Sequence, residues 1–228
     1  MTYICDFPIE VVRSQRKKSA SINVKNNHVI ISVPKNLSDF RIQEIINKKS
    51  VWIKTRLKEQ KETSTPILKE FVSGESFPYL GKNFRLKIEV GDEPSVKLKN
   101  GYIVVQVPKE QNSKDRIKYY LEEWYKIHAI NKLKEKTIRF SKSVGVTPKT
   151  ISIKSYKARW GSCSANGDII YNWKIILAPH RIVDYVVIHE LCHLLEHNHS
   201  PRYWKLVARH MQDWKTRRDW LKTNDFTF

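Results

Sequence analysis

The stretch HELCHLLEHNHSPRYW, residues 189–204, contains the pattern on which the interpretation of this chain depends. It holds four of the chain's eight histidines and two glutamates within eleven positions. His189 and His193 are four residues apart, so on a helix both imidazoles project from one face, one turn along. Glu190 stands beside them, on the shoulder of that face. This is the H-E-x-x-H arrangement, in which two histidines bind zinc and the glutamate reaches a water.

The residues that follow supply a third candidate ligand. Asn198 suits a left-handed residue that closes the helix, and Ser200 and Pro201 suit the N-cap and first position of the next helix. His199 therefore falls on a short link, from which its imidazole can turn back towards the first two histidines. Three histidines and an open fourth position are the form of a catalytic zinc site. The predicted ligands of one zinc ion per chain are His189, His193 and His199.

Other side chains near the cluster have less specific interpretations. Glu196 returns to the ligand face two turns along, where it either contacts the ligands from outside or is a surface carboxylate. His197 points away from the pair and is expected to be solvated. Cys192 lies on the apolar side of the helix, and Trp204 is expected to pack rather than to bind.

Length and composition indicate a folded protein. At 228 residues the chain can bury one large core or two small ones. No apolar run approaches the ~18 residues of a membrane span, and the N-terminal stretch lacks the apolar region of a signal peptide. Cys5, Cys163 and Cys192 are odd in number and scattered, which suits reduced thiols. We therefore expect a cytoplasmic protein without membrane contact.

The formal net charge of +19 has two interpretations. It either reflects lysine-rich solvated helices or marks a polyanionic partner, meaning a nucleic acid or a phosphate-bearing substrate. The sequence contains no recognition-helix signature, RNP motif or glycine-rich phosphate loop that favours the second.

The first part of the chain is predicted to form two β-hairpins. In residues 20–35 apolar positions alternate about Asn26-Asn27, and in residues 84–109 they alternate about Asn100-Gly101, a strong type I′ turn signal.

The two hairpins also resemble each other. HVIISVPK at 28–35 recurs as YIVVQVPK at 102–109, and each copy precedes an amphipathic helix. This indicates a repeated hairpin-plus-helix unit, with residues 61–70 as the expected link between the copies.

The remainder of the chain alternates helix and strand. A long helix is predicted from about residue 113 to 140, strands follow, and a helix from about 180 to 197 carries the histidine cluster. That last helix is apolar on nearly every side, so it is expected to be buried. The fold class is therefore α+β. A β-rich N-terminal region with the hairpin repeat is expected at 1–110 and the metal-binding core at 111–228, either as two domains or packed as one.

Four motifs, taken in order, resemble one known family. They are RWGSCS at 159–164, YNWKIILAP at 171–179, DYVVIHELCHLLEHNHS at 184–200 and YW at 203–204. Together they resemble the YgjP-like metal-dependent hydrolases, a bacterial and archaeal family classed with the zincin metallopeptidases and similar in its core to the SprT and WLM peptidases. The resemblance is strong over 151–222 and looser over the rest of the chain.

The resemblance carries further expectations. It implies a zincin-like core around the H-E-x-x-H helix, with the same three histidines as ligands and Glu190 as the catalytic carboxylate. It also draws attention to Arg159 and Asn172. Arg159 either stabilises an oxyanion, holds a phosphate or has a structural role. In zincins a strand before the active-site helix commonly binds peptide as an added strand, which would make residues 168–177 the substrate edge.

The function favoured by these points is that of a zinc metallopeptidase acting on protein or peptide, with Glu190 as the general base. A metal-dependent nucleotide pyrophosphatase or phosphohydrolase is the alternative, because the same water could attack a phosphoanhydride. A third hypothesis is a DNA-associated protein whose zinc is structural. The glutamate beside three ligands argues against a purely structural metal.

Overall fold

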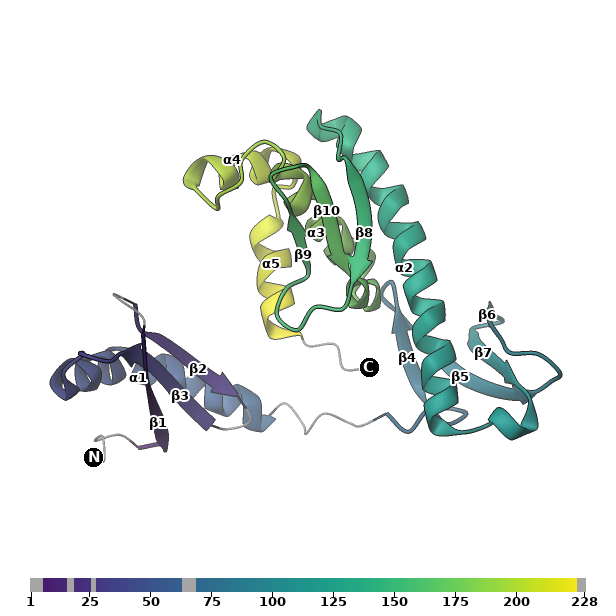
Figure 1. Ribbon diagram of the computed structural model, residues 1–228, viewed down its shortest axis with the longest axis horizontal. Helices are drawn as coiled ribbons and strands as arrows, with labels where there is room; N and C mark the ends of the chain where they lie inside the picture. The colour runs from purple at the N-terminus through teal and green to yellow at the C-terminus, as the bar shows by residue number, and fades with distance from the viewer. Residues whose placement is uncertain (1–5, 16–18, 26–27, 63–68, 225–228) are drawn as a thin grey trace. The chain divides into compact units, whose positions relative to one another are not determined.

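The computed structural model of this chain describes residues 6–15, 19–25, 28–62 and 69–224, and these form a mixed α+β structure (Figure 1). The chain divides into two compact units, Met1–Ile67 and Leu68–Phe228. The expected boundary between residues 110 and 111 falls inside the second unit, because the strands before it share one hydrophobic core with the helices after it. Of the predicted link at 61–70, residues 63–68 lie outside the described residues.

The first unit is a three-stranded sheet with one helix. Its elements are β1 (Ile9–Ser14), β2 (Ser21–Lys25), β3 (His28–Pro34) and α1 (Asp39–Glu62). β3 lies in the centre, antiparallel to β2 and parallel to β1. Alternate β3 residues bury one face of the sheet in a core that also contains Ile42, Ile46 and Ile53 of α1. The predicted first hairpin is confirmed as the β2–β3 pair, and its Asn26-Asn27 turn lies outside the described residues.

The second unit begins with a four-stranded sheet and a long helix. Its elements are β4 (Ser76–Tyr79), β5 (Lys82–Val90), β6 (Ser95–Lys99), β7 (Tyr102–Val107), the 3-10 turn η1 (Lys109–Gln111) and α2 (Lys114–Val144). The sheet order is β4-β5-β7-β6. Asn100 and Gly101 both have positive φ, 53° and 80°, as a type I′ turn requires. The predicted second hairpin is therefore confirmed.

A second sheet and three helices complete this unit. They are β8 (Thr150–Lys154), β9 (Gly161–Cys163), β10 (Asp168–Asn172), the 3-10 helix η2 (Trp173–Leu177), α3 (His180–Cys192), α4 (Pro201–His210) and α5 (Trp214–Thr223). The strand order is β8-β10-β9. β10 is thus the central strand, and the expectation that residues 168–177 form a free substrate edge is wrong. The short strand β9 lies at the edge instead.

One topology occurs three times along the chain. In each case two consecutive strands pair with the third, the first parallel to it and the second antiparallel, and a helical segment follows. The first two copies, around β3 and β7, coincide with the repeat seen in the sequence. The third, around β10, leads through η2 into α3, the helix that carries His189 and Glu190.

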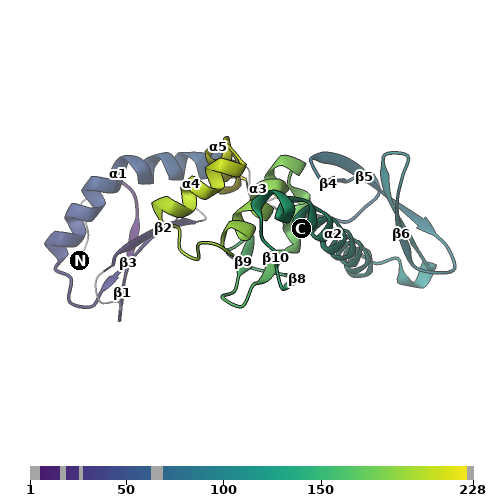
Figure 2. The ribbon, with the colours of Figure 1, turned by 90° about the horizontal axis from the view of Figure 1, so that it is seen from above.

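α3 is the buried centre of the second unit. It contacts α2, α4, α5, β9 and η2, and α2 runs alongside it in both views (Figures 1 and 2). Its apolar residues on every side are buried, as expected for a helix without a polar face. A buried ion pair ties the two helices together, with Lys136 Nζ of α2 2.6 Å from Asp184 Oδ1 of α3.

The end of α3 differs from the prediction. The helix stops at Cys192, a turn follows at 193–195, and Asn198 does not take the left-handed conformation. The chain therefore leaves the helix directly after the first two histidines, several residues earlier than its apolar pattern indicates. The start of α4 is as predicted: the Ser200 side chain caps it by accepting a hydrogen bond from the backbone N–H of Tyr203, 3.2 Å away, and Pro201 is the first helical residue.

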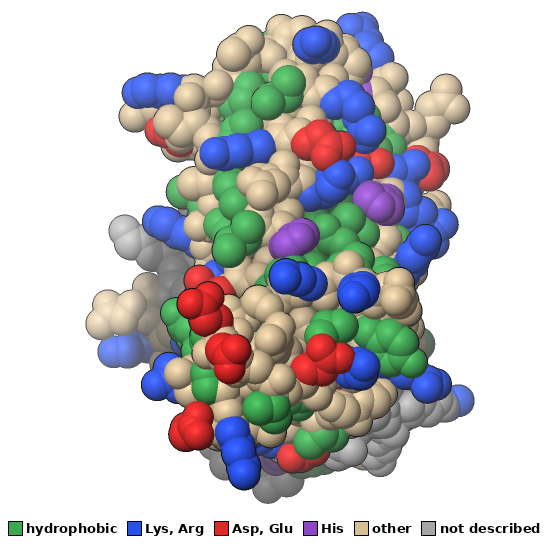
Figure 3. Space-filling model, turned by 90° about the vertical axis from the view of Figure 1, so that its right-hand side faces the viewer, with side chains coloured by type: hydrophobic (Ala, Val, Ile, Leu, Met, Phe, Trp, Pro, Cys, Tyr) green, Lys and Arg blue, Asp and Glu red, His purple; other side chains and the backbone are tan. Residues whose placement is uncertain are grey.

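The basic residues do not form one patch on the face shown in Figure 3, where Lys and Arg side chains are spread among apolar and acidic ones. Among the described residues, no helix combines the length and the apolar character that a membrane crossing needs.

Candidate active site

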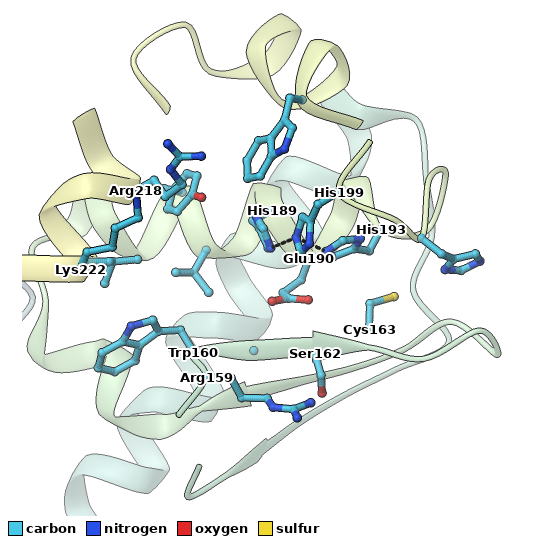
Figure 4. Close-up of a pocket in the computed structure, with 16 residues that line it drawn as sticks. Arg159, Trp160, Ser162, Cys163, His189, Glu190, His193, His199, Arg218 and Lys222 are labelled. Carbon is cyan, nitrogen blue, oxygen red and sulfur yellow. Dashed lines mark hydrogen bonds between the residues drawn. The ribbon is translucent and has the colours of Figure 1, made fainter. Parts of the chain in front are cut away.

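A cavity of about 570 Å³ in the second unit holds the histidine cluster. Its walls come from β9 and the residues just before it, from α3, from the turn after α3, and from α4 and α5. Figure 4 shows the imidazoles above the Glu190 carboxylate, with β9 below it. The cavity therefore gathers groups from the third topological copy and from the helices that follow it.

The three predicted ligands come together at one point. The Nε2 atom of His199 lies 3.2 Å from the Nε2 atom of His189 and 3.2 Å from that of His193 (Figure 4). One ligand atom from each of the three side chains lies within 4.8 Å of the others. The early end of α3 allows this, because the chain can turn at 193–195 and return His199 to the helix end.

Aromatic side chains of α4 hold the imidazoles in place. The Tyr203 ring stacks on His193, with centroids 4.5 Å apart, and its hydroxyl donates to the backbone carbonyl of His189 at 3.0 Å. The Trp204 ring stacks on His199, with centroids 5.3 Å apart and an interplanar angle of 17°. Trp204 thus packs, as expected, but it packs on a predicted ligand.

The environment keeps the imidazoles neutral. Burial, and then the neighbouring imidazoles of His193 and His199, lower the pKa of His189 to about 3. Burial also lowers the pKa of His193 and of His199. His193 Nδ1 lies 3.1 Å from the Glu196 backbone carbonyl, which can only accept, so Nδ1 donates and Nε2 keeps its lone pair for the centre of the cluster.

The geometry fits a tetrahedral metal site. Zinc binds imidazole nitrogens at about 2.0–2.1 Å, which places two ligand nitrogens of a tetrahedron about 3.3 Å apart. The two Nε2–Nε2 distances of 3.2 Å agree with that spacing. Neutral imidazoles are also a donor type that such a metal prefers.

Glu190 lies beside this cluster with almost no exposure to solvent, at 4%. Its Oε2 atom is buried and has no hydrogen-bond partner among the described residues. Burial raises the pKa of Glu190 to about 8, and the Arg159 guanidinium acts in the opposite direction. A buried carboxylate with an unused oxygen is suited to exchange a proton with a group in the cavity.

A glycine makes the space for this carboxylate. A Cβ atom placed on Gly161 of β9 would lie 2.5 Å from Glu190 Oε1 and 2.8 Å from its Cγ and Cδ atoms. Any other residue at this position would therefore collide with the glutamate.

The remaining predicted residues lie in different places. Arg159 lines the cavity, with its guanidinium 5.5 Å from the centre of the Tyr156 ring. Asn172 is buried outside the cavity lining, and its amide nitrogen donates to the backbone carbonyls of Tyr156 and Arg159, so it orders the segment before β9. The Glu196 carboxylate faces Arg202 at 3.7 Å, and only the backbone carbonyl of Glu196 contacts the cluster.

Four residues that the site description uses escaped the sequence interpretation. They are Gly161, Tyr203, Arg218 and Lys222, of which the last two line the cavity from α5. The only sequence signal was the position of the first two inside the RWGSCS and YW motifs, which gives no role by itself.

A family model matches most of this chain. Residues 18–224 match the family described as "YgjP-like, metallopeptidase domain". One solved structure similar to this chain is the metallopeptidase zymogen of Pyrococcus abyssi abylysin, at 20% identity and a TM-score of 0.37, covering 40% of this chain and 92% of that one. No curated protein matches the chain. The family match does not support the hypotheses of nucleotide hydrolysis or DNA association.

Proposed function

This chain belongs to the YgjP-like metallopeptidase family, and on that premise we propose that it is a zinc peptidase in which His189, His193 and His199 hold the metal and Glu190 is the general base. The family and the three-histidine group support a metal-dependent hydrolase of the metallopeptidase type. The observation that carries the finer proposal is the convergence of three Nε2 atoms beside a buried carboxylate with an unpaired oxygen.

Each group has a defined part in peptide hydrolysis. Zinc, when bound, supplies a Lewis acid that lowers the pKa of a water and polarises the scissile carbonyl. Glu190 accepts the proton of the attacking water at its unpaired Oε2 atom and passes it to the nitrogen of the leaving amine. Burial raises the pKa of Glu190, which favours the protonated form that the side chain takes once it has accepted that proton.

The peptide backbone is proposed to lie along β9. This strand is at the edge of its sheet, and its three residues Gly161–Cys163 all line the cavity. An edge strand has backbone N–H and C=O groups that an extended peptide can pair with, which places the scissile bond without side-chain recognition. This replaces the central strand β10 as the substrate edge.

The test is turnover of an unfolded protein substrate by zinc-loaded protein and by its Glu190→Gln variant. Glutamine keeps the shape of the side chain but cannot accept the proton, so we expect the variant to bind one zinc per chain and lose nearly all peptide cleavage. A loss of about 10²-fold or more is expected for removal of a general base.

A matched control is Glu196→Gln, which makes the same change at a carboxylate that faces Arg202 rather than the cluster. It should cleave at the rate of the unmodified protein. Full activity of Glu190→Gln would remove Glu190 from the mechanism, and absence of cleavage by the zinc-loaded parent protein on every peptide offered would refute the peptidase proposal.

A further inference from the structure

One wall of the cavity carries an arginine that lies against a pair of stacked tryptophans. The Arg218 guanidinium of α5 lies 5.2 Å from the centre of the Trp204 ring and 4.9 Å from that of Trp214. The two rings stack on each other, with centroids 4.3 Å apart and an interplanar angle of 12°. Aromatic faces attract a cation, so the guanidinium is held in one position before any substrate arrives.

This arginine is linked to the metal cluster through the same stack. Trp204 contacts Arg218 and also stacks on the predicted ligand His199. Arg218 lines the cavity, and its side chain is 34% exposed, so it is accessible to a bound molecule. Its Nε atom is buried without a hydrogen-bond acceptor, and the nearest carboxylate oxygen, Asp219 Oδ1, is 3.6 Å away.

The charges around the cavity are unbalanced. Its lining includes three cationic side chains, Arg159, Arg218 and Lys222, and one carboxylate, Glu190 (Figure 4). Asp219, which is exposed, lies 2.7 Å from Lys222 Nζ and neutralises part of the charge on α5. The net charge of the wall remains positive, which attracts an anionic group of a substrate and repels a cationic one.

We propose that Arg218, supported by Lys222, is a carboxylate receptor that makes this peptidase prefer substrates with an acidic group beside the scissile bond. The inference rests on the proposed peptidase function and adds a substrate class to it. The planar fork of a guanidinium matches a carboxylate with two parallel N–H···O bonds, and an arginine fixed by stacking loses little freedom when it makes them. The carboxylate comes from an Asp or Glu side chain or from the peptide's C-terminus.

The experiment begins with cleavage sites. Unfolded proteins are digested with the zinc-loaded protein, the sites are mapped by mass spectrometry, and synthetic peptides are made around the best site. At the position enriched in acidic residues, Glu is compared with Gln in a C-terminally amidated peptide. A second pair compares the free and amidated C-terminus. We expect kcat/KM to favour one carboxylate by about 10- to 100-fold, and the pair that shows the preference identifies its source.

Variants assign the preference to α5. Arg218→Gln should reduce the ratio between the charged and neutral peptides to within about threefold. Arg209→Gln makes the same change at an exposed arginine of α4 outside the cavity lining and should keep the full ratio. If Arg218→Gln disturbs the tryptophan stack and unfolds the protein, Lys222→Gln serves in its place, with an expected severalfold fall in the ratio.

Binding gives a readout that does not depend on turnover. The dissociation constants of the same peptides for the Glu190→Gln protein, measured by fluorescence anisotropy, should show the same preference and lose it with Arg218→Gln. If the parent protein cleaves no peptide, the peptidase proposal fails. The receptor is then decided by the same binding measurement on an arbitrary peptide pair that differs only in Glu against Gln and on a pair that differs only in a free against an amidated C-terminus.

Three results would overturn the receptor. The first is a parent protein that treats the charged and neutral peptides alike. The second is a preference that survives Arg218→Gln. The third is ATP binding that depends on Arg218 while the acidic peptide binds no better than the neutral one, which would show that the arginine binds phosphate instead.

Discussion

Gly161→Ala should damage catalysis by displacing one side chain. The added methyl group would lie 2.5 Å from Glu190 Oε1 and 2.8 Å from Cγ and Cδ, about 0.9 Å inside ordinary contact at the closest atom. The φ angle of Gly161 is not positive, so an alanine meets no backbone strain there. The only steric clash is therefore with the Glu190 side chain. Rotating the carboxylate group alone cannot relieve this clash, because Cγ also lies too close to the new methyl group.

The expected magnitude follows from that overlap. Glu190 must move by roughly 1 Å into the cavity, and a misplacement of that size costs about 10²-fold in rate. The stability cost of such overpacking is about 1–3 kcal/mol. The three imidazoles come from α3 and the turn after it rather than from β9, so zinc content should stay at one per chain.

The assay is kcat/KM on peptide together with metal analysis and urea unfolding, repeated in a Glu190→Ala background. Removing the glutamate side chain removes the atoms that collide, so Gly161→Ala should cost almost nothing in stability there. The double-mutant cycle should then show a coupling energy close to the loss of unfolding free energy that Gly161→Ala causes in the parent protein. Unchanged activity in Gly161→Ala, or an equal stability cost in both backgrounds, would refute the reasoning.

Three more predictions follow from the packing around the site. Asp184→Asn should lower the free energy of unfolding, measured in urea, by about 3–5 kcal/mol, because it leaves the Lys136 ammonium without its carboxylate although that side chain is only 5% exposed. Lys136→Met should lower the free energy of unfolding much less, since Asp184 still has the Arg139 guanidinium 3.4 Å away. His199→Ala should abolish the binding of one zinc per chain. His197 is an exposed neighbour outside the three-histidine group, so His197→Ala should keep the zinc. Equal zinc content of the two variants by elemental analysis would contradict the ligand assignment. A fragment of residues 68–228 should fold and bind zinc like the whole chain, because the two units have separate cores and the cavity lies within 159–222; loss of zinc binding by calorimetry would show that residues 1–67 are needed.

Local chemistry is the part of the fold that could be predicted from the sequence. Asn100 and Gly101 accept positive φ at low cost, so the turn and the register of the second hairpin followed from two neighbouring residues. Ser200 and Pro201 fixed the start of α4 in the same way. His189 and Glu190 share a helix, so the helical period predicted their relation without knowledge of any other element.

Strand order could not be predicted, because it depends on pairing between distant segments. β8 and β10 pair in parallel, with β9 and its connections between them in the chain, and no local turn signal specifies that contact. β9 has only three residues and begins with a glycine, so it lacks the alternating pattern that reveals a strand. The third copy of the topology was missed for this reason, and β10 was taken for an edge.

The position of the Glu190 carboxylate shows why the site was only partly predictable. A donor atom belongs to its residue, so a histidine or glutamate can be recognised wherever it stands in the sequence. The space around a side chain cannot be recognised in the same way, because it depends on which residues pack nearby. Glu190 has room only because β9 places Gly161, which has no side chain, opposite α3. Likewise Arg218 resembles the other arginines of the chain until Trp204 and Trp214 stack and fix it against the cavity. Histidines spaced by a helical period can thus be recognised in one sequence, whereas the surroundings of Glu190 and Arg218 become visible only once elements far apart in the chain have packed.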